Sequence, residues 1–321
     1  MTQHLTPNEQ YLSERIAPDR PFASLLDFPL YFEIETVNAC NARCPMCTID
    51  DWQRHTPVMK RDLFEKIATE LCANADKVKR VALYRDGEPL LDKWLANRVK
   101  VLKSGGIKNV GISTNVSLLN EKRATELLKA GLDEIVLSID SLDRKTFEEI
   151  RLKLSFDECM ENALRFIKLR NKIRPECAIW VRMIRQESNK HEWPEYFKFW
   201  KDILSKNDRC YYLDIHNWGG QLDGIQPDKP TTSPCVALWS LMVIFADGNV
   251  PMCNVDYNNK HPTGDVYTHS IAEIWQNAAQ NGRRKIHMAG ARAGIDMCAN
   301  CTVWNKPASD LHRSVDTVAA E

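Results

Sequence analysis

The chain has 321 residues, of which 44% are apolar, so it is long enough for one large domain with a buried core and a smaller one. Lys plus Arg and Asp plus Glu both number 43, and this zero net charge excludes the basic footprint typical of nucleic-acid and anionic-membrane binding. No apolar run reaches transmembrane length, and the N-terminus lacks the features of a signal peptide. We therefore expect a cytoplasmic protein whose 11 cysteines do not form a disulfide framework.

Residues 1–30 are polar and interrupted by proline, which predicts an N-terminal arm over the surface. Helical segments with apolar stripes at 3.6-residue spacing, such as 60–74, then alternate with strand-like segments. This alternation predicts an α/β fold with a parallel sheet, whose functional residues follow the carboxyl ends of the strands. The six expected strands cover 31–36, 81–84, 110–114, 134–139, 178–184 and 210–215.

Three cysteines, Cys40, Cys44 and Cys47, lie at spacings of four and three on the loop after the first expected strand. Three thiolates can bind three irons of a [4Fe-4S] cluster and leave the fourth iron open. A structural zinc site would need a fourth ligand nearby, and the sequence around this loop offers only His55.

This CxxxCxxC loop resembles the motif of the radical S-adenosylmethionine (SAM) superfamily. The resemblance implies a partial (β/α)6 barrel over residues 31–220 and a cluster whose open iron binds SAM. It further implies that an electron, supplied by a reduced flavodoxin or ferredoxin, cleaves SAM to a 5′-deoxyadenosyl radical. That radical abstracts hydrogen from the substrate.

The segment Asp86-Gly87-Glu88-Pro89 follows the second strand and resembles the GGEP segment of the same family. The resemblance implies that Glu88 engages the SAM ammonium group. Asp86 stands where the family has the first glycine of the pair, which is a departure from its pattern. Taken as a bare sequence, the segment predicts only a turn.

Polar residues also follow the next two strands. In the family, such side chains hold the SAM carboxylate and ribose, and an Arg before the following helix pairs with the carboxylate. The alternative roles are helix capping, turn formation and a surface ion pair. The candidates that the resemblance implies are Ser113, Asn115, Ser138, Asp140 and Arg151.

Two further residues are candidates for the substrate site. Arg182 interrupts an apolar strand, so it either binds substrate at a strand end or faces solvent. His216 follows the sixth strand and is either a structural histidine or a base. We name both as candidate catalytic residues.

The proline-containing loop 221–234 precedes a second module over residues 235–304, and 305–321 form an expected tail. The run 241–250 predicts a β-hairpin, and a short helix is expected around 271–275. Four cysteines in this module suit either zinc or a second [4Fe-4S] cluster. They are Cys235, Cys253, Cys298 and Cys301.

This Cys-rich hairpin and helix module resembles the twitch domain, the shortened form of the SPASM domain, which implies one auxiliary [4Fe-4S] cluster. The cysteine spacing is similar to that of family members that oxidise an aminocyclitol. The resemblance therefore implies a small-molecule substrate, oxidised at a hydroxyl-bearing carbon of a sugar, cyclitol or related metabolite. Epimerisation of such a metabolite, modification of a peptide or protein, and a zinc-bearing binding protein are the alternatives.

Overall fold

The computed structural model describes residues 5–222 and 232–303. The expected tail 305–321 and most of the expected loop 221–234 lie outside the described residues. The described chain divides into two compact units. The larger unit comprises 34–215 and 245–247, and the smaller unit comprises 5–33, 216–222, 232–244 and 248–303. In the described part of the chain, no helix is long and apolar enough to cross a membrane.

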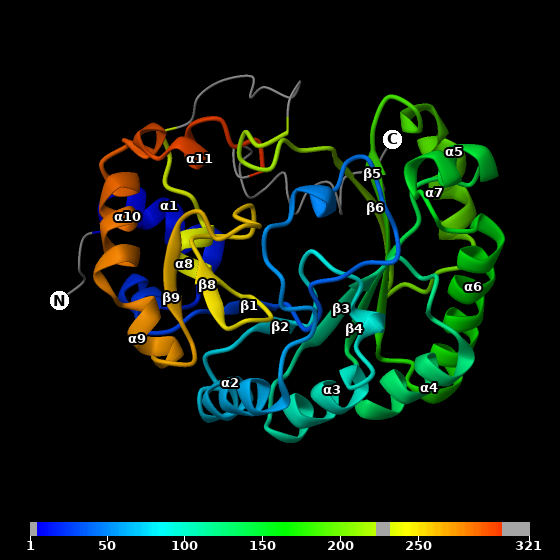
Figure 1. The fold of residues 1–321 in the computed structure, drawn as a ribbon, viewed down its shortest axis with the longest axis horizontal. Helices are drawn as coiled ribbons and strands as arrows, with labels where there is room; N and C mark the ends of the chain where they lie inside the picture. The colour runs from blue at the N-terminus through cyan, green and yellow to red at the C-terminus, as the bar shows by residue number, and fades with distance from the viewer. Residues whose placement is uncertain (1–4, 223–231, 304–321) are drawn as a thin grey trace. The chain divides into compact units, whose positions relative to one another are not determined.

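A seven-stranded sheet has the order β6-β5-β4-β3-β2-β1-β7 (Figure 1). Each of the six predicted strands is present, and the neighbours from β2 to β6 pair in parallel. The predicted α/β class with a partial barrel is therefore confirmed. The strands are β1 (Tyr31–Ile34), β2 (Arg80–Ala82), β3 (Val110–Thr114), β4 (Glu134–Ser138), β5 (Ala178–Arg185), β6 (Arg209–Asp214) and β7 (Leu241–Ile244).

Helices connect the strands of the larger unit, and Figure 1 shows α3, α4, α6 and α7 along the outer side of β2–β6. Every residue of β3 and β4 is buried, as expected for strands covered on both faces. The helices of this unit are α2 (Arg61–Ala73), α3 (Leu95–Ser104), α4 (Glu121–Ala130), α5 (Arg144–Ile150), α6 (Phe156–Ile173), α7 (Trp193–Lys201), and the single turns η2 (Ile49–Asp51), η3 (Pro89–Leu91) and η4 (Lys190–Glu192).

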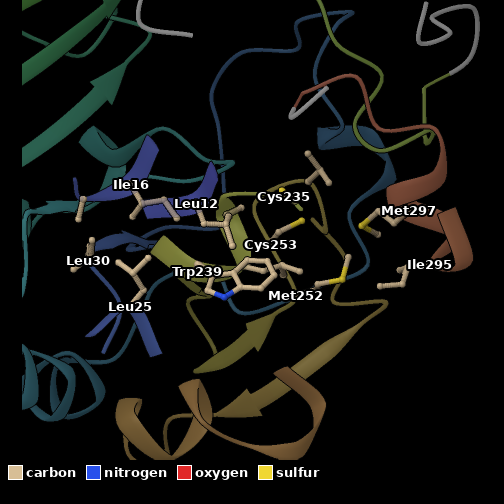
Figure 2. Close-up of a cluster of buried hydrophobic side chains, with 14 residues drawn as sticks. Leu12, Ile16, Leu25, Leu30, Cys235, Trp239, Met252, Cys253, Ile295 and Met297 are labelled. Atoms are coloured by element: carbon tan, nitrogen blue, oxygen red, sulfur yellow. The ribbon is translucent and has the colours of Figure 1, made fainter. Parts of the chain in front are cut away.

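The smaller unit is built on short helices and one antiparallel strand pair, β8 with β9. A buried apolar cluster joins its segments and includes Trp239 and the thiols Cys235 and Cys253 (Figure 2). Its elements are α1 (Pro7–Ile16), η1 (Phe22–Leu26), α8 (Ala237–Ser240), β8 (Asn249–Pro251), β9 (Pro262–Asp265), α9 (Ile271–Trp275), α10 (Ala278–Met288), η5 (Arg292–Gly294) and α11 (Asp296–Ala299).

The sequence led us to expect that the N-terminal segment lies over the surface as an arm. In the structure, part of this segment is buried. Thr6 and Glu9 form a capping box that starts α1. Leu12 and Ile16, one turn apart on this helix, are buried in the apolar cluster of the smaller unit together with Leu25. The capping box and the one-turn spacing were both readable in the sequence.

The two strands expected to form a hairpin over 241–250 do not pair with each other. Gly248 makes the turn with φ +88°, a conformation that favours glycine. However, β7 before the turn belongs to the seven-stranded sheet, whereas β8 after it pairs with β9. The hairpin of this domain is therefore β8–β9. Local turn chemistry predicted the turn, but the pairing depends on strands that are distant in sequence.

Candidate iron–sulfur and SAM site

The three cysteines after β1 lie close enough to interact electrostatically. The Cys47 N–H donates to the Cys44 carbonyl at 2.9 Å, which folds the end of the loop into a turn. Burial raises the pKa of Cys40, and burial, Asp86 and the two neighbouring thiols together raise the pKa of Cys47 to about 12. Iron binds cysteine as the thiolate, so binding of a cluster here would release protons from the loop.

Two side chains from distant elements contact the sulfurs of this loop. The Asn115 amide lies 3.8 Å from the Cys40 sulfur and also donates to Asn41 at 2.9 Å. The Arg151 guanidinium lies 3.7 Å from the Cys44 sulfur. Donors aimed at sulfur favour thiolates over thiols, so this environment fits metal-bound cysteines.

Gly87 and Glu88 dock the loop after β2 against the cysteine loop. A Cβ on Gly87 would lie 2.3 Å from the Val37 carbonyl oxygen, so only glycine fits there. The Glu88 carboxylate is buried and accepts hydrogen bonds from Thr114 Oγ1 at 2.7 Å, from the Asn115 N–H at 2.7 Å and from the Leu90 N–H at 3.0 Å. A carboxylate accepts about four hydrogen bonds, so capacity for one more donor remains.

The structure also gives a role to Asp86, the residue that departs from the family pattern. Its carboxylate is fully buried and pairs with Arg85 and with Arg54, the latter at 3.1 Å. Arg54 in turn donates to both oxygens of Glu35. A buried network of charges thus links the loop after β2 to Glu35, directly after β1, and to the segment that follows the cysteines.

Ser113, Ser138 and Arg182 come together at the carboxyl ends of three neighbouring strands. Ser138 and Arg182 are register partners on β4 and β5. The Arg182 Nη2 donates to Ser138 Oγ at 2.9 Å and to Ser113 Oγ at 3.2 Å, and its Nε is buried without an acceptor among the described residues. Arg182 therefore points inward to the strand ends and not to solvent.

Asp140 and Arg151 form an ion pair with one another. The Arg151 Nε lies 2.6 Å from Asp140 Oδ2, while Asp140 Oδ1 accepts the Ile184 N–H at 2.7 Å. Burial opposes the charge of Arg151, but Asp140 and Cys44 raise its pKa above the ordinary value. Asp140 is fully buried, and it contacts both Arg151 and the end of β5.

The four cysteines of the smaller unit also group together. Burial raises the pKa of Cys235 and Cys298 to about 12, and each thiol responds to others in the group. Figure 2 shows Cys235 beside Cys253 within the apolar cluster. Among the described residues, no three Cys, His, Asp or Glu side chains are arranged to hold a single metal ion. A cubane cluster has four separate irons, so its ligands need not converge on one point.

His216 belongs to the smaller unit, where its ring lies against Trp218 with centroids 4.7 Å apart. Its Nδ1 accepts the Trp218 N–H at 3.2 Å. The predicted catalytic candidates Arg182 and His216 are thus assigned to different units.

Two residues near the cysteine loop were missed in the sequence. Val116, directly after Asn115, has φ +72°, which is a strained conformation for a β-branched residue. The Cys159 thiol donates to the Asn115 carbonyl at 3.6 Å and is fully buried. The sequence carries no signal for the strain at Val116, and the contact of Cys159 joins segments that are far apart in the chain.

Comparison with known proteins agrees with this geometry. The radical SAM superfamily profile matches residues 34–184, and the profile of an iron–sulfur cluster-binding domain, SPASM, matches residues 235–302. A GTP 3′,8-cyclase of Desulforamulus reducens is 28% identical over 54% of the chain, and the chain spans about half (52%) of the cyclase's length.

Three further comparisons cover most of the chain. The S-adenosyl-L-methionine-dependent 2-deoxy-scyllo-inosamine dehydrogenase of Niallia circulans is 24% identical over 84% of this chain and 91% of its own. The structure of BtrN with AdoMet and 2-DOIA superposes with a TM-score of 0.58 at 23% identity, over 85% of this chain and 93% of that one. Streptococcus suis SuiB bound to its precursor peptide SuiA gives a TM-score of 0.63 at 17% identity, over 86% of this chain and 70% of that one. The chain belongs to the radical SAM superfamily and carries a C-terminal SPASM-type domain.

Proposed function

We propose that Cys40, Cys44 and Cys47 hold the SAM-cleaving [4Fe-4S] cluster. The donors that face their sulfurs support this assignment. A reduced flavodoxin or ferredoxin would supply its electron. The residues proposed to surround SAM are Glu88, Ser113, Asn115, Ser138 and Arg151, with Asp140 orienting Arg151.

In the smaller unit, Cys235, Cys253, Cys298 and Cys301 would hold one auxiliary [4Fe-4S] cluster. The grouping of these thiols in a buried environment and the SPASM-type match support a cluster. Four cysteine ligands would leave no open iron for substrate. When bound, SAM and the two clusters supply a hydrogen-abstracting radical and an electron acceptor.

The reaction that we propose is oxidation of a hydroxyl-bearing carbon of a sugar, cyclitol or related small metabolite to a ketone. The alignment with the inosamine dehydrogenase carries this proposal, because it covers 84% of this chain and 91% of that enzyme. The substrate loses one hydrogen atom, one proton and one electron, so a donor to its oxygen and a proton acceptor are required.

Arg182 is the proposed ligand of the substrate oxygen, since its guanidinium already faces the strand ends. His216, in the smaller unit, remains the candidate base that the sequence offers, because an imidazole nitrogen can accept a proton.

The competing outcome is epimerisation, which needs a thiol that returns hydrogen to the substrate. Cys159 and Cys177 are fully buried. Cys72 lies against Gly105 between α2 and α3, because a Cβ on that glycine would meet its sulfur. Of these three thiols, only Cys159 adjoins the residues around the cysteine loop, and its hydrogen is directed to the Asn115 carbonyl. None of these three thiols is arranged to return hydrogen to a substrate, and on this ground we favour oxidation. Cys210, whose register partner on β5 is Val181, is the remaining thiol for a Cys→Ala test of epimerisation.

The test is incubation in heavy water with SAM, dithionite and a panel of aminocyclitols and sugars that begins with 2-deoxy-scyllo-inosamine. A product lighter by two hydrogens, with one 5′-deoxyadenosine per turnover, is expected. An isomer that carries one non-exchangeable deuterium, and that is lost in Cys159→Ala, would instead show an epimerase. Turnover of peptides alone would place the chain with the peptide-modifying members of the family.

A further inference from the structure

Arg292 is a buried cation next to the four-cysteine group of the smaller unit. Arg292 is the first residue of η5, and it is only 2% exposed. The Ile295 N–H donates to the Arg292 carbonyl at 3.1 Å, and the Cys298 N–H donates to the Ile295 carbonyl at 2.9 Å. Two consecutive turns therefore fix the backbone of Arg292 relative to that of Cys298.

The Arg292 guanidinium has little compensation from the described residues. Its Nη1 makes one long hydrogen bond of 3.4 Å, to the Ser233 carbonyl. Its Nε is buried and has no acceptor there. A buried guanidinium without a carboxylate partner is costly unless another negative group lies close to it.

The cysteines are the negative group that this position offers. The guanidinium contacts the Ser233 carbonyl, two residues before Cys235, and the two turns tie the backbone of Arg292 to Cys298. The positive charge of Arg292 accordingly acts on the thiols of both segments. Arg292 thus lies near enough to influence ligands from two different segments. Four thiolates that hold a cluster would carry a net negative charge, which the guanidinium would compensate.

We infer that Arg292 raises the reduction potential of the auxiliary cluster and so makes it an effective electron acceptor. This inference rests on the proposed auxiliary cluster. Reduction adds one negative charge to a cluster, and a nearby cation stabilises the reduced form more than the oxidised form. The effect is strong in a buried site because charges interact more strongly there than in water. Arg292 is therefore a positioning residue that tunes the cofactor and does not touch the substrate.

Arg284 provides a matched comparison in the same unit. It is also buried, at 4% exposure, but it donates to the Leu238 carbonyl at 3.0 Å and to the Trp275 carbonyl at 2.9 Å. Burial alone lowers its pKa to about 10, and no cysteine contributes to that shift. Replacing Arg284 removes a buried cation without removing charge from the cysteine group.

The experiment uses the Cys40/Cys44/Cys47→Ala chain, reconstituted anaerobically, so that only the auxiliary cluster is titrated. EPR-monitored redox titration then gives its midpoint potential. With Arg292→Met, we expect the ratio of reduced to oxidised cluster at a fixed potential to fall about tenfold, which is about 59 mV for a one-electron couple. The midpoint potential should stay near the parent value in Arg292→Lys, which keeps the charge, and in Arg284→Met.

The possible outcomes distinguish a failure of the inference about Arg292 from a failure of the proposed auxiliary cluster. An intact cluster signal with an unchanged midpoint in Arg292→Met overturns the role of Arg292, as does an equal shift in Arg284→Met. Absence of any iron–sulfur signal in the parent triple variant overturns the auxiliary cluster itself. If Arg292→Met does not retain its iron, Arg292→Gln is compared with Arg292→Lys, and equal midpoints for these two overturn the inference.

Discussion

At the scale of single residues, close backbone approach makes the second position of the Asp-Gly-Glu-Pro turn intolerant of any side chain. The Gly87 position lies against two carbonyl oxygens, which a Cβ would approach to 2.3 and 2.6 Å. Those oxygens belong to Val37 and Ala39, just before the cysteine loop. The turn thus holds the start of that loop in place, which explains why the glycine is present although Asp86 replaces its neighbour.

We predict that Gly87→Ala lowers the free energy of unfolding by about 2 kcal/mol or more, because backbone must move to relieve the overlap. Gly282→Ala is the control. That glycine lies within α10, and a Cβ added to it would meet no heavy atom within 4 Å, so alanine should stabilise the protein by about 1 kcal/mol. Chemical denaturation measures both changes. A Gly87→Ala protein as stable as the parent would contradict this account of the turn.

The buried carboxylate of Glu88 gives a second prediction at this scale. In Glu88→Gln one acceptor oxygen becomes an amide donor that faces the donors of Thr114 and Asn115. We expect a loss of about 1–3 kcal/mol in unfolding free energy and weaker SAM binding. Exposed Glu126→Gln is the control and should change neither quantity. Calorimetry measures both, and wild-type SAM affinity in Glu88→Gln would show that Glu88 is not a SAM ligand.

At the scale of elements, one buried ion pair joins α6 to the two last parallel strands. Arg170 on α6 donates to both oxygens of Asp208, at 2.7 and 2.5 Å, and to the Cys177 carbonyl at 2.7 Å. Asp208 also accepts the Ile179 N–H at 2.8 Å. Burial opposes the charge of Asp208, but Arg170 and the backbone donors hold its pKa below the ordinary value.

We predict that Asp208→Asn destabilises the protein by about 3 kcal/mol at neutral pH, since it leaves a buried guanidinium without its partner. Because the folded pKa of Asp208 lies below the unfolded one, its contribution is full at neutral pH and is lost as the pH falls below about 4. Asp157→Asn, which breaks the exposed bidentate pair with Arg144, should cost no more than about 1 kcal/mol. Equal losses for the two variants, measured by chemical denaturation, would contradict this distinction.

The sequence predicted the positions of strands and helices better than it predicted which strands and side chains contact one another. Alternating strand and helix patterns located all six barrel strands, because the buried residues of each strand leave a local apolar signal in the sequence. It did not show that Arg151 pairs with Asp140, or that Arg182 meets Ser113 and Ser138, because those contacts join segments that are far apart in the chain. The placement of β7 was missed for the same reason, whereas α1 was missed although its capping box and one-turn apolar spacing are local signals.

At the scale of the whole molecule, the two units should depend differently on metal. The smaller unit has short helices and one strand pair, and its cysteines lie in or against its apolar cluster. We predict that Cys298→Ala with Cys301→Ala makes residues 232–303 sensitive to limited proteolysis, since metal binding would stabilise this unit. Fragments of the larger unit, 34–215, should persist. Unchanged protection of both units would contradict a structural role for the second metal group.

The central claim is that seven cysteines form two separate [4Fe-4S] sites, of which only the first cleaves SAM. The most direct measurement is the iron content of anaerobically reconstituted protein together with the yield of 5′-deoxyadenosine. We predict about eight irons for the parent chain and about four for each of two variants, Cys40/Cys44/Cys47→Ala and Cys298/Cys301→Ala. Only the second variant should still produce 5′-deoxyadenosine. Production of 5′-deoxyadenosine by the first variant, or about four irons in the parent chain, would contradict the account.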